Sequence, residues 1–259
     1  MKRVQLGPVA VDAVDHRGAL QQVARLVESG SGGYVVTPNV DHIVLASRDA
    51  TLQEVYAGAS LSLADGQPLT WMARLLGTPL PERVSGADLF LPLMQQAADR
   101  GWRVFLFGAS EEASLEAAHR LTGRFPALQI VGRDTSWWSP DDEESSGGLP
   151  VALAIRDSGA QLVILGLGCP RQELWMARYR NLIAPAVAFG FGASIDFAAG
   201  RVRRAPAWMS RAGLEWTFRL WCEPRRLAHR YLRRDLHILP IVVSAWLQSL
   251  TNGRRTHRG

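Results

Sequence analysis

The hydrophobic positions of this 259-residue chain fall into short continuous runs with longer helix-like stretches between them. The runs lie at 32–38 (GGYVVTP), 61–65 (LSLAD), 101–108 (GWRVFLFG), 127–132 (ALQIVG), 160–168 (AQLVILGLG) and 185–192 (PAVAFGFG). Runs that are apolar throughout and bounded by Gly or Pro are typical of strands buried on both faces. Their alternation with helical stretches predicts βαβ units and an α/β fold with a mostly parallel sheet flanked by helices.

The clearest unit runs from residue 101 to residue 132. Its first strand ends at Gly108, and Ser110 can cap a helix that carries Glu111 and Glu112 in its first turn. Units of this kind are found in many Rossmann-like proteins, so we expect a Rossmann-like core. Near the N-terminus, VQLGPVAVDAV (4–14) predicts a small hairpin, and SPDDEESSGGLP (139–150) predicts a polar loop.

The pattern changes after Asp196. The remaining sequence loses the strand rhythm, is rich in Arg and Trp, and predicts several short helices. Three prolines are expected to separate these helices: Pro206, Pro224 and Pro240. We therefore predict a core at 1–196 and a helical appendage at 197–259.

Charge is distributed unevenly along the chain. The net charge is +5, but residues 201–259 hold 13 Arg against three acidic residues, and the first 200 residues carry a net charge of −5. Such a basic block favours phosphate-bearing partners: nucleic acid, a nucleotide diphosphate or an anionic membrane surface.

The two cysteines, Cys169 and Cys222, form neither a CxxC pair nor a metal-ligand motif, which fits a reducing compartment. The N-terminus lacks the apolar core of a secretory signal, and no stretch reaches the roughly 18 apolar residues of a membrane-spanning helix. We therefore expect a cytoplasmic protein.

Asp65 is the first candidate for chemistry. It stands where the apolar run 61–65 meets Gly66 and a helix-like stretch that continues through Trp71. One interpretation is that Asp65 caps this helix. The other is catalytic, because groups that meet ligands in open α/β sheets lie just past the carboxyl ends of strands. This stretch alone leaves both interpretations open.

Two glycine pairs follow predicted strands. Gly166 and Gly168 lie in ILGLGCPRQELW, and Gly190 and Gly192 lie in AFGFGASIDF. Glycines between a strand and a helix let backbone N–H groups approach a phosphate, and the helix N-terminus favours negative charge. The first motif is not GxGxxG, so a dinucleotide fingerprint is not supported, and a purely structural turn is the alternative.

Polar residues follow two further elements. Thr37 and Asn39 flank a proline in VVTPNVDH, where turn and cap chemistry is the alternative to ligand binding. His42 is better explained as a helix residue than as a ligand, because the sequence places no Cys or second His beside it. Arg83 precedes a predicted helix start at Ser85, and its alternative role is that of a solvated loop residue.

Taken in order, the segments resemble the WecG/TagA/CpsF family of bacterial glycosyltransferases, glycosyltransferase family 26. The similarity runs from about Val4 to Arg234 and rests on TPNVDH, LADGQPLTW, PERVSGADLF, VFLFGAS, LGLGCPRQELWM, GFGASIDFAAG and RAPAWMSRAGLEWTFRLWCEPRRLAHRY. The resemblance implies transfer of a hexose or N-acetylhexosamine from a UDP-sugar to a polyprenyl-diphosphate-linked saccharide, with inversion, during surface polysaccharide or teichoic acid biosynthesis. It also suggests that subunits associate.

The resemblance implies a set of site residues. Asp65 is similar to the family's proposed general base, and the residues that the resemblance places in catalysis are Asp65, Arg83 and Gln172. Those that it places at the substrate are Thr37, Asn39, Gly166, Gly168, Glu173, Gly190, Gly192, Asp196, Arg219, Arg226 and Arg230. No DxD pair follows a predicted strand, so we expect no metal and no cofactor at the reaction, with the three tail arginines stabilising the leaving UDP.

The tail also predicts a membrane contact. In EPRRLAHRYLRRD, Arg226, Arg230 and Arg233 share one helix face, and tryptophans lie nearby in the sequence. We therefore expect a peripheral protein on the inner face of the cell membrane. The alternatives are a nucleic-acid-binding protein, against which the acidic first 200 residues argue, and a purely structural membrane-surface protein.

Overall fold

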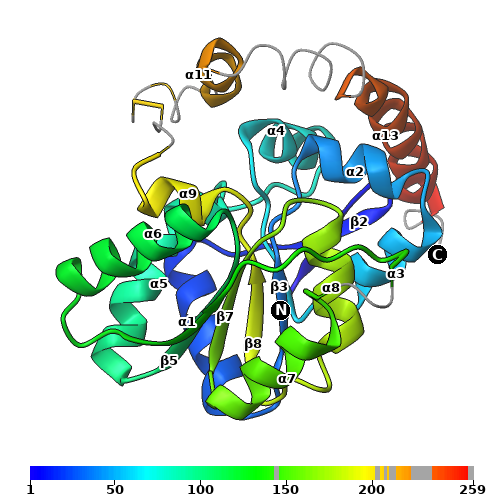
Figure 1. Cartoon of the computed structure of the whole chain (residues 1–259). Coiled ribbons are helices and arrows are strands. Elements are labelled where there is room, and N and C mark those ends of the chain that lie inside the picture. The colour runs from blue at the N-terminus through cyan, green and yellow to red at the C-terminus, as the bar shows by residue number, and fades with distance from the viewer. Residues whose placement is uncertain (143–145, 202–204, 207–208, 210–213, 223–234, 256–259) are drawn as a thin grey trace.

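The computed structural model describes residues 1–142, 146–201, 205–206, 209, 214–222 and 235–255. Its core is a six-stranded parallel sheet with helices on both faces (Figure 1). The predicted α/β, Rossmann-like architecture is confirmed.

All six predicted runs form strands of this sheet. In spatial order they are β4 (Leu61–Ser62), β3 (Gly33–Val36), β8 (Val187–Gly190), β7 (Leu162–Gly166), β5 (Arg103–Gly108) and β6 (Gln129–Asp134). The central register pairs Gly33 with Val187 and Leu165 with Gly190, so neighbouring strands end at nearly the same level.

The helices divide between the two faces. One face is covered by α1 (His16–Glu28), α5 (Gly86–Arg100), α6 (Glu111–Arg124) and α9 (Ser194–Ala198). The other is covered by α2 (Val40–Ala46), α3 (Ala50–Ala57), α4 (Gln67–Leu75), α7 (Leu149–Ser158) and α8 (Arg171–Tyr179). The predicted cap of α6 is confirmed, because the Ser110 side chain accepts from the backbone N–H of Ala113.

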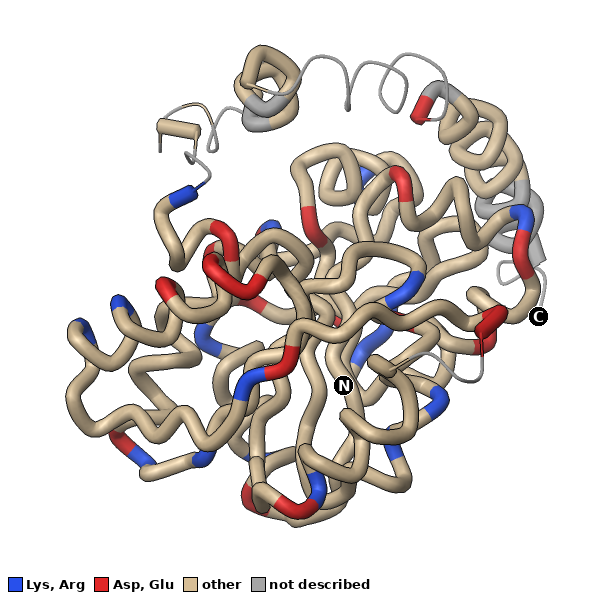
Figure 2. Tube along the Cα trace, in the orientation of Figure 1, with Lys and Arg blue, Asp and Glu red and all other residues tan. Residues whose placement is uncertain are grey.

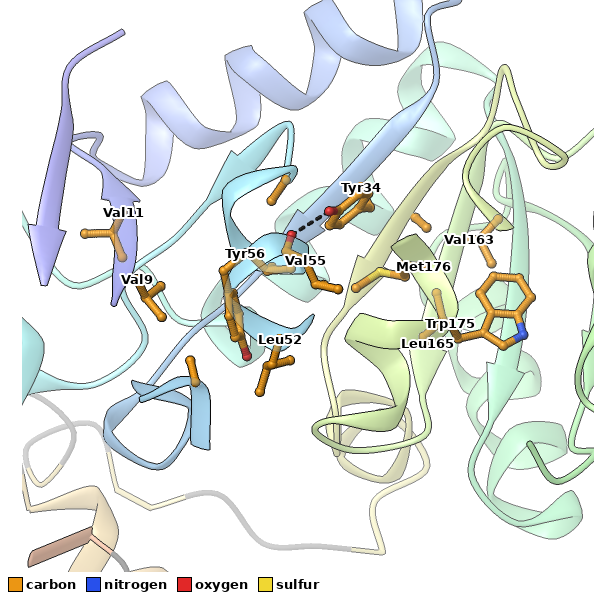
Figure 3. Packing of buried hydrophobic residues seen from close by; sticks show 14 of the residues in the cluster. Val9, Val11, Tyr34, Leu52, Val55, Tyr56, Val163, Leu165, Trp175 and Met176 are labelled. Carbon is orange, nitrogen blue, oxygen red and sulfur yellow. Dashed lines mark hydrogen bonds between the residues drawn. The ribbon is translucent and has the colours of Figure 1, made fainter. Parts of the chain in front are cut away.

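Successive strand residues feed two separate cores. Leu162 and Ile164 of β7 join the cluster under α1 and α5, whereas Val163 and Leu165 join the cluster under α3 and α8. This follows from the two-residue period of a strand. Figure 3 shows the second cluster, in which Leu165 and Val163 lie beside Trp175. Both faces are apolar, which explains the continuous hydrophobic runs.

The predicted hairpin is formed by β1 (Arg3–Leu6) and β2 (Val9–Asp12). Asp12 is buried; its Oδ2 accepts from the Ser62 N–H at 2.8 Å, and its Oδ1 lies 3.1 Å from Nε of Arg3. The hairpin is thereby fixed to the edge strand β4.

The described parts of the tail are helical: α11 (Glu215–Cys222), the 3₁₀ helix η2 (Asp235–His237) and α13 (Ile238–Arg255). The expectation that Pro240 separates helices is wrong. Pro240 lies in the first turn of α13, where a missing N–H costs no helix hydrogen bond. Pro224 lies outside the described residues.

One face of α13 packs on the core through Ile238, Ile241, Val242 and Ala245. Figure 2 shows acidic and basic residues dispersed around the core elements. Among the helices that the structure describes, none combines the length and the hydrophobicity needed to cross a membrane.

Candidate active site

The carboxyl ends of four neighbouring strands, β4, β3, β8 and β7, gather most of the predicted site residues at one edge of the sheet. Thr37 follows β3 and is buried, and its Oγ1 donates to the Gly190 carbonyl of β8 at 3.0 Å. The Asp65 N–H donates to the Pro38 carbonyl at 2.9 Å. These bonds join the segments that follow β4, β3 and β8 into one surface.

Asp65 is not the N-cap residue of the helix that follows it. The N-cap of α4 is Gly66, which makes no side-chain cap bond and has a φ of 107°, a left-handed value that favours glycine. Asp65 therefore stands one residue before the N-cap position. The turn instead leaves Asp65 partly exposed at the edge where ligands bind in open α/β folds.

Asn39 has the cap role that its sequence allows. It is the N-cap of α2, and its Oδ1 accepts from the His42 N–H at 3.3 Å. Asn39 remains partly exposed beside Thr37, so the cap also fixes its position at the strand end. A contact between Asn39 and substrate stays a prediction.

Arg83 lies in the loop beside Asp65. The N–H of Val84 donates to the Ala64 carbonyl at 3.0 Å, which ties this loop to the segment before Asp65. The Arg83 guanidinium pairs with Asp88, whose Oδ2 also accepts from the Ser85 hydroxyl at 2.7 Å. A carboxylate on α5 therefore orients this arginine.

Gln172 and Glu173 are buried beneath the Gly192 turn and hold it through hydrogen bonds. Gln172 Oε1 accepts from the Gly192 N–H at 3.2 Å, and its Nε2 donates to Glu173 Oε1 at 2.8 Å. Glu173 thus sets the orientation of the Gln172 amide, and the amide holds the Gly192 turn. Their direct contact with substrate stays a prediction.

Of the four candidate glycines, Gly166 and Gly190 are closely packed, whereas Gly168 and Gly192 have free space beside them. A Cβ at Gly190 would lie 2.9 Å from Gln172 Nε2, and one at Gly166 would lie 3.1 Å from Ile195 Cδ1. Gly168 and Gly192 have φ of +77° and +53°, and a Cβ on either would meet nothing within 4 Å. The backbone is therefore open to a ligand at the outer glycine of each pair.

We expect Gly168→Val to weaken UDP binding by about tenfold or more, because a branched side chain would block the approach of phosphate to the backbone. Gly30→Val is the matched control: Gly30 has a φ of +65°, also meets nothing within 4 Å, and follows α1 at the opposite edge of the sheet. Calorimetric titration with UDP compares the variants. Equal affinities in the two would show that the Gly168 turn is only structural.

The structure brings together three residues that the sequence left apart. A ring nitrogen of His42, the Sγ of Cys169 and a carboxylate oxygen of Glu173 all lie within 4.8 Å of one another. The expectation that no cysteine accompanies His42 is thus wrong, because Cys169 comes from the loop after β7. The only available sequence signal was the four-residue spacing from Cys169 to Glu173.

Burial dominates the ionisation of this cluster. It raises the pKa of Glu173 to about 7, against hydrogen bonding from Gln172 that favours the carboxylate. Burial, reinforced by the negative charge of Glu173, raises the pKa of the Cys169 thiol well above its usual value. The Tyr56 hydroxyl lies 3.9 Å from the Cys169 Sγ.

A cation–aromatic pair that the sequence did not single out lies farther along the same edge. The Arg171 guanidinium carbon is 3.8 Å from the Trp137 ring centroid, and Trp137 is 62% exposed. Arg171 begins α8 after β7, and Trp137 follows β6, so both belong to the carboxyl edge.

The remaining predicted residues belong to α9 and the tail. Asp196 is partly exposed on α9, and Arg219 belongs to α11, although its side chain is not described. Arg226 and Arg230 lie outside the described residues. In Figure 1, α13 lies beside α2.

Comparison with known proteins gives the same assignment as the motifs. Residues 4–252 match the model of the glycosyl transferase WecG/TagA/CpsF family. The N-acetylglucosaminyldiphosphoundecaprenol N-acetyl-beta-D-mannosaminyltransferase of Bacillus spizizenii (strain ATCC 23059 / NRRL B-14472 / W23) is 33% identical over 200 residues, covering 77% of this chain and 75% of the relative. The Bacillus subtilis (strain 168) enzyme of the same name is 30% identical with the same coverage. The chain therefore belongs to the WecG/TagA/CpsF family of glycosyltransferases.

Proposed function

We propose that this glycosyltransferase moves a hexose or N-acetylhexosamine from a UDP-sugar to a polyprenyl-diphosphate-linked saccharide, with inversion at the anomeric carbon. The acceptor class is supported by the two Bacillus relatives, whose names specify an undecaprenol diphosphate carrying N-acetylglucosamine. The observation that carries the proposal is the position of Asp65, which is partly exposed beside the segment of Thr37 and Asn39 and directly precedes Gly66, the N-cap residue of α4.

An inverting transfer needs a base on the acceptor side. In the proposed reaction Asp65 takes the proton from the acceptor hydroxyl, whose oxygen attacks the anomeric carbon. The bond from that carbon to the β-phosphate oxygen breaks, and its electron pair leaves with UDP. Gly168 and Gly192 offer open backbone to the diphosphate, and Arg219, Arg226 and Arg230 are proposed to neutralise it.

The donor lies across several strands in this proposal. Neighbouring strands are about 4.8 Å apart, so Asp65 after β4 and Gly168 after β7 are separated by roughly 14 Å along the edge. A nucleotide-sugar is of comparable length. Its sugar would then lie near Asp65, with its nucleotide toward the Gly168 turn and the Arg171–Trp137 pair.

The experiment that tests the function is a screen of UDP-sugars against a lipid-diphosphate-linked acceptor, with the product identified by mass spectrometry and its anomeric configuration by NMR. Transfer with inversion from one UDP-sugar supports the proposal. Hydrolysis alone, transfer from donors with another nucleotide, or retention of configuration contradicts it.

We expect transfer to need no Mg²⁺ or Mn²⁺, because arginines replace a metal at the diphosphate. The rate is measured in EDTA and again after Mg²⁺ or Mn²⁺ is added. Activity that is lost in EDTA and restored by either ion contradicts the expectation.

A membrane contact through the tail is part of the proposal. Leu239, Val243, Trp246 and Leu247 of α13 are exposed, and so are Trp216 and Trp221 of α11, with Trp221 at 88%. Aromatic and aliphatic side chains of this kind suit the interfacial region of a bilayer. Arg226, Arg230 and Arg233, which the sequence predicts on one helix face but which lie outside the described residues, would add attraction to anionic lipid. The two-part division at residue 196 and self-association remain predictions.

A further inference from the structure

The proposed transfer gives no chemical step to His42, Cys169 or Glu173, although Glu173 orients the Gln172 amide and the resemblance places it at the substrate. Its members come from three segments: His42 from α2, Cys169 from the loop after β7, and Glu173 from the first turn of α8. His42 is buried, Glu173 has no exposed surface, and Cys169 is partly exposed. The cluster therefore lies beneath the surface where β3 and β7 end, with one member within reach of solvent.

The spacing of the ligand atoms suits a small metal ion. The imidazole nitrogen, the thiol sulfur and the carboxylate oxygen all lie within 4.8 Å of one another. Ligands of a tetrahedral zinc ion are roughly 3.5 Å apart, because zinc bonds to nitrogen or oxygen are about 2.0–2.1 Å and those to sulfur about 2.3 Å. Movements of about 1 Å by the side chains would suffice for coordination.

The surroundings favour a cation. The charges that act on the Cys169 thiol, those of Glu173 and Asp41, are both negative. Oε1 of Glu173 accepts from Gln172 Nε2 at 2.8 Å, and the Cys169 thiol lies within hydrogen-bonding reach of the same buried carboxylate, so a metal ion would take the place of the thiol proton between them. A thiolate, a carboxylate and a neutral imidazole would together balance the charge of one divalent ion. Gln172 would orient the carboxylate ligand, as outer-shell partners do in metal sites.

We propose that His42, Cys169 and Glu173 bind a Zn²⁺ ion that joins α2 to the start of α8. A thiolate and an imidazole select zinc over Mg²⁺ and Mn²⁺, which prefer oxygen ligands. Three protein ligands leave a fourth position for water, and the partial exposure of Cys169 gives the ion a path of entry. The zinc ion has no role at the diphosphate in this proposal, although Cys169 directly follows Gly168, because arginines neutralise that charge in the proposed reaction.

Cobalt substitution tests the site in the full-length protein. Protein freed of metal with a chelator is titrated with CoCl₂, and we expect stoichiometric binding with a thiolate-to-cobalt charge-transfer band and the intense visible bands of tetrahedral Co²⁺. Added ZnCl₂ should displace the cobalt and raise the thermal unfolding midpoint. We expect Cys169→Ser to lose the charge-transfer band, and His42→Ala and Glu173→Gln each to bind Co²⁺ at least about tenfold more weakly.

Cys222→Ser is the matched control, because Cys222 is the other free cysteine and is exposed on α11. The proposal requires the charge-transfer band in the wild-type protein and in Cys222→Ser. It is overturned if wild-type protein shows no such band, if the band survives Cys169→Ser, or if it disappears in Cys222→Ser. If a variant fails to fold, the presence or absence of the charge-transfer band in the wild-type protein still tests the proposal. None of these measurements depends on transferase activity.

Discussion

Asp65→Asn is expected to lower the rate of sugar transfer by roughly 10²–10⁴-fold and to leave UDP affinity nearly unchanged. The amide has almost the same shape as the carboxylate but cannot accept the proton of the attacking hydroxyl. The backbone bond from the Asp65 N–H to the Pro38 carbonyl does not involve the side chain, so it is kept in the variant.

Asp157→Asn is the matched control for this variant. Asp157 is an exposed residue near the end of α7, at the opposite edge of the sheet, and pairs with Arg156. Transfer is measured with a UDP-sugar and a lipid-diphosphate-linked acceptor, and UDP affinity is measured by calorimetry. Wild-type transfer rates in Asp65→Asn would remove Asp65 as the base, and loss of UDP binding would indicate a role in holding the donor.

Truncation before Arg201 is expected to abolish transfer and to release the protein from anionic vesicles. The deletion removes the 13 Arg of the tail together with the exposed tryptophans of α11 and α13. Each basic residue near an anionic surface is worth about 1 kcal/mol, so vesicle binding should fall sharply. Transfer should be lost because Arg219, Arg226 and Arg230 are proposed to hold the leaving diphosphate.

A single substitution separates the two roles of the tail. The truncation also removes the α13 face that packs on the core through Ile241 and Val242, so its folding must be checked by circular dichroism. Arg226→Ala leaves that face in place, and we expect it to slow transfer by roughly 10²-fold while most vesicle binding remains.

Arg25→Ala is the control for Arg226→Ala, because Arg25 is exposed in the last turn of α1 and its loss changes the net charge equally. A folded truncated protein that transfers sugar to a water-soluble acceptor at the full-length rate would show that the tail is only an anchor. Transfer by Arg226→Ala at the rate of Arg25→Ala would remove Arg226 from the active site.

The elements of the core could be predicted because their signals are local. A strand buried on both faces is a continuous apolar run, and every run proposed from the sequence became a strand of the sheet. The cap at Ser110 and the hairpin near the N-terminus were also predicted, since both depend on residues close together in the chain. Pro240 was misjudged because a proline in the first turn of a helix resembles one that separates two helices.

The sequence also determined the family, because seven motifs in a fixed order are specific even when each alone is ambiguous. It could not decide the role of Asp65, since a helix cap and an active-site carboxylate have the same local pattern. The structure fixes its position: Gly66, with its left-handed φ, is the N-cap residue of α4, and a bond to Pro38 places Asp65 beside β3, while its catalytic role stays a prediction.

Contacts between distant segments were decided by the tertiary structure alone. Thr37 reaches the carbonyl of Gly190 because β3 and β8, far apart in the chain, are neighbours in the sheet. His42 meets Cys169 and Glu173 for a similar reason, since α2 and α8 cover the same face. Hydrophobic periodicity fixes which residues face the core, but the order in which parallel strands assemble depends on the packing of all the helices together, and that order places the side chains of the site.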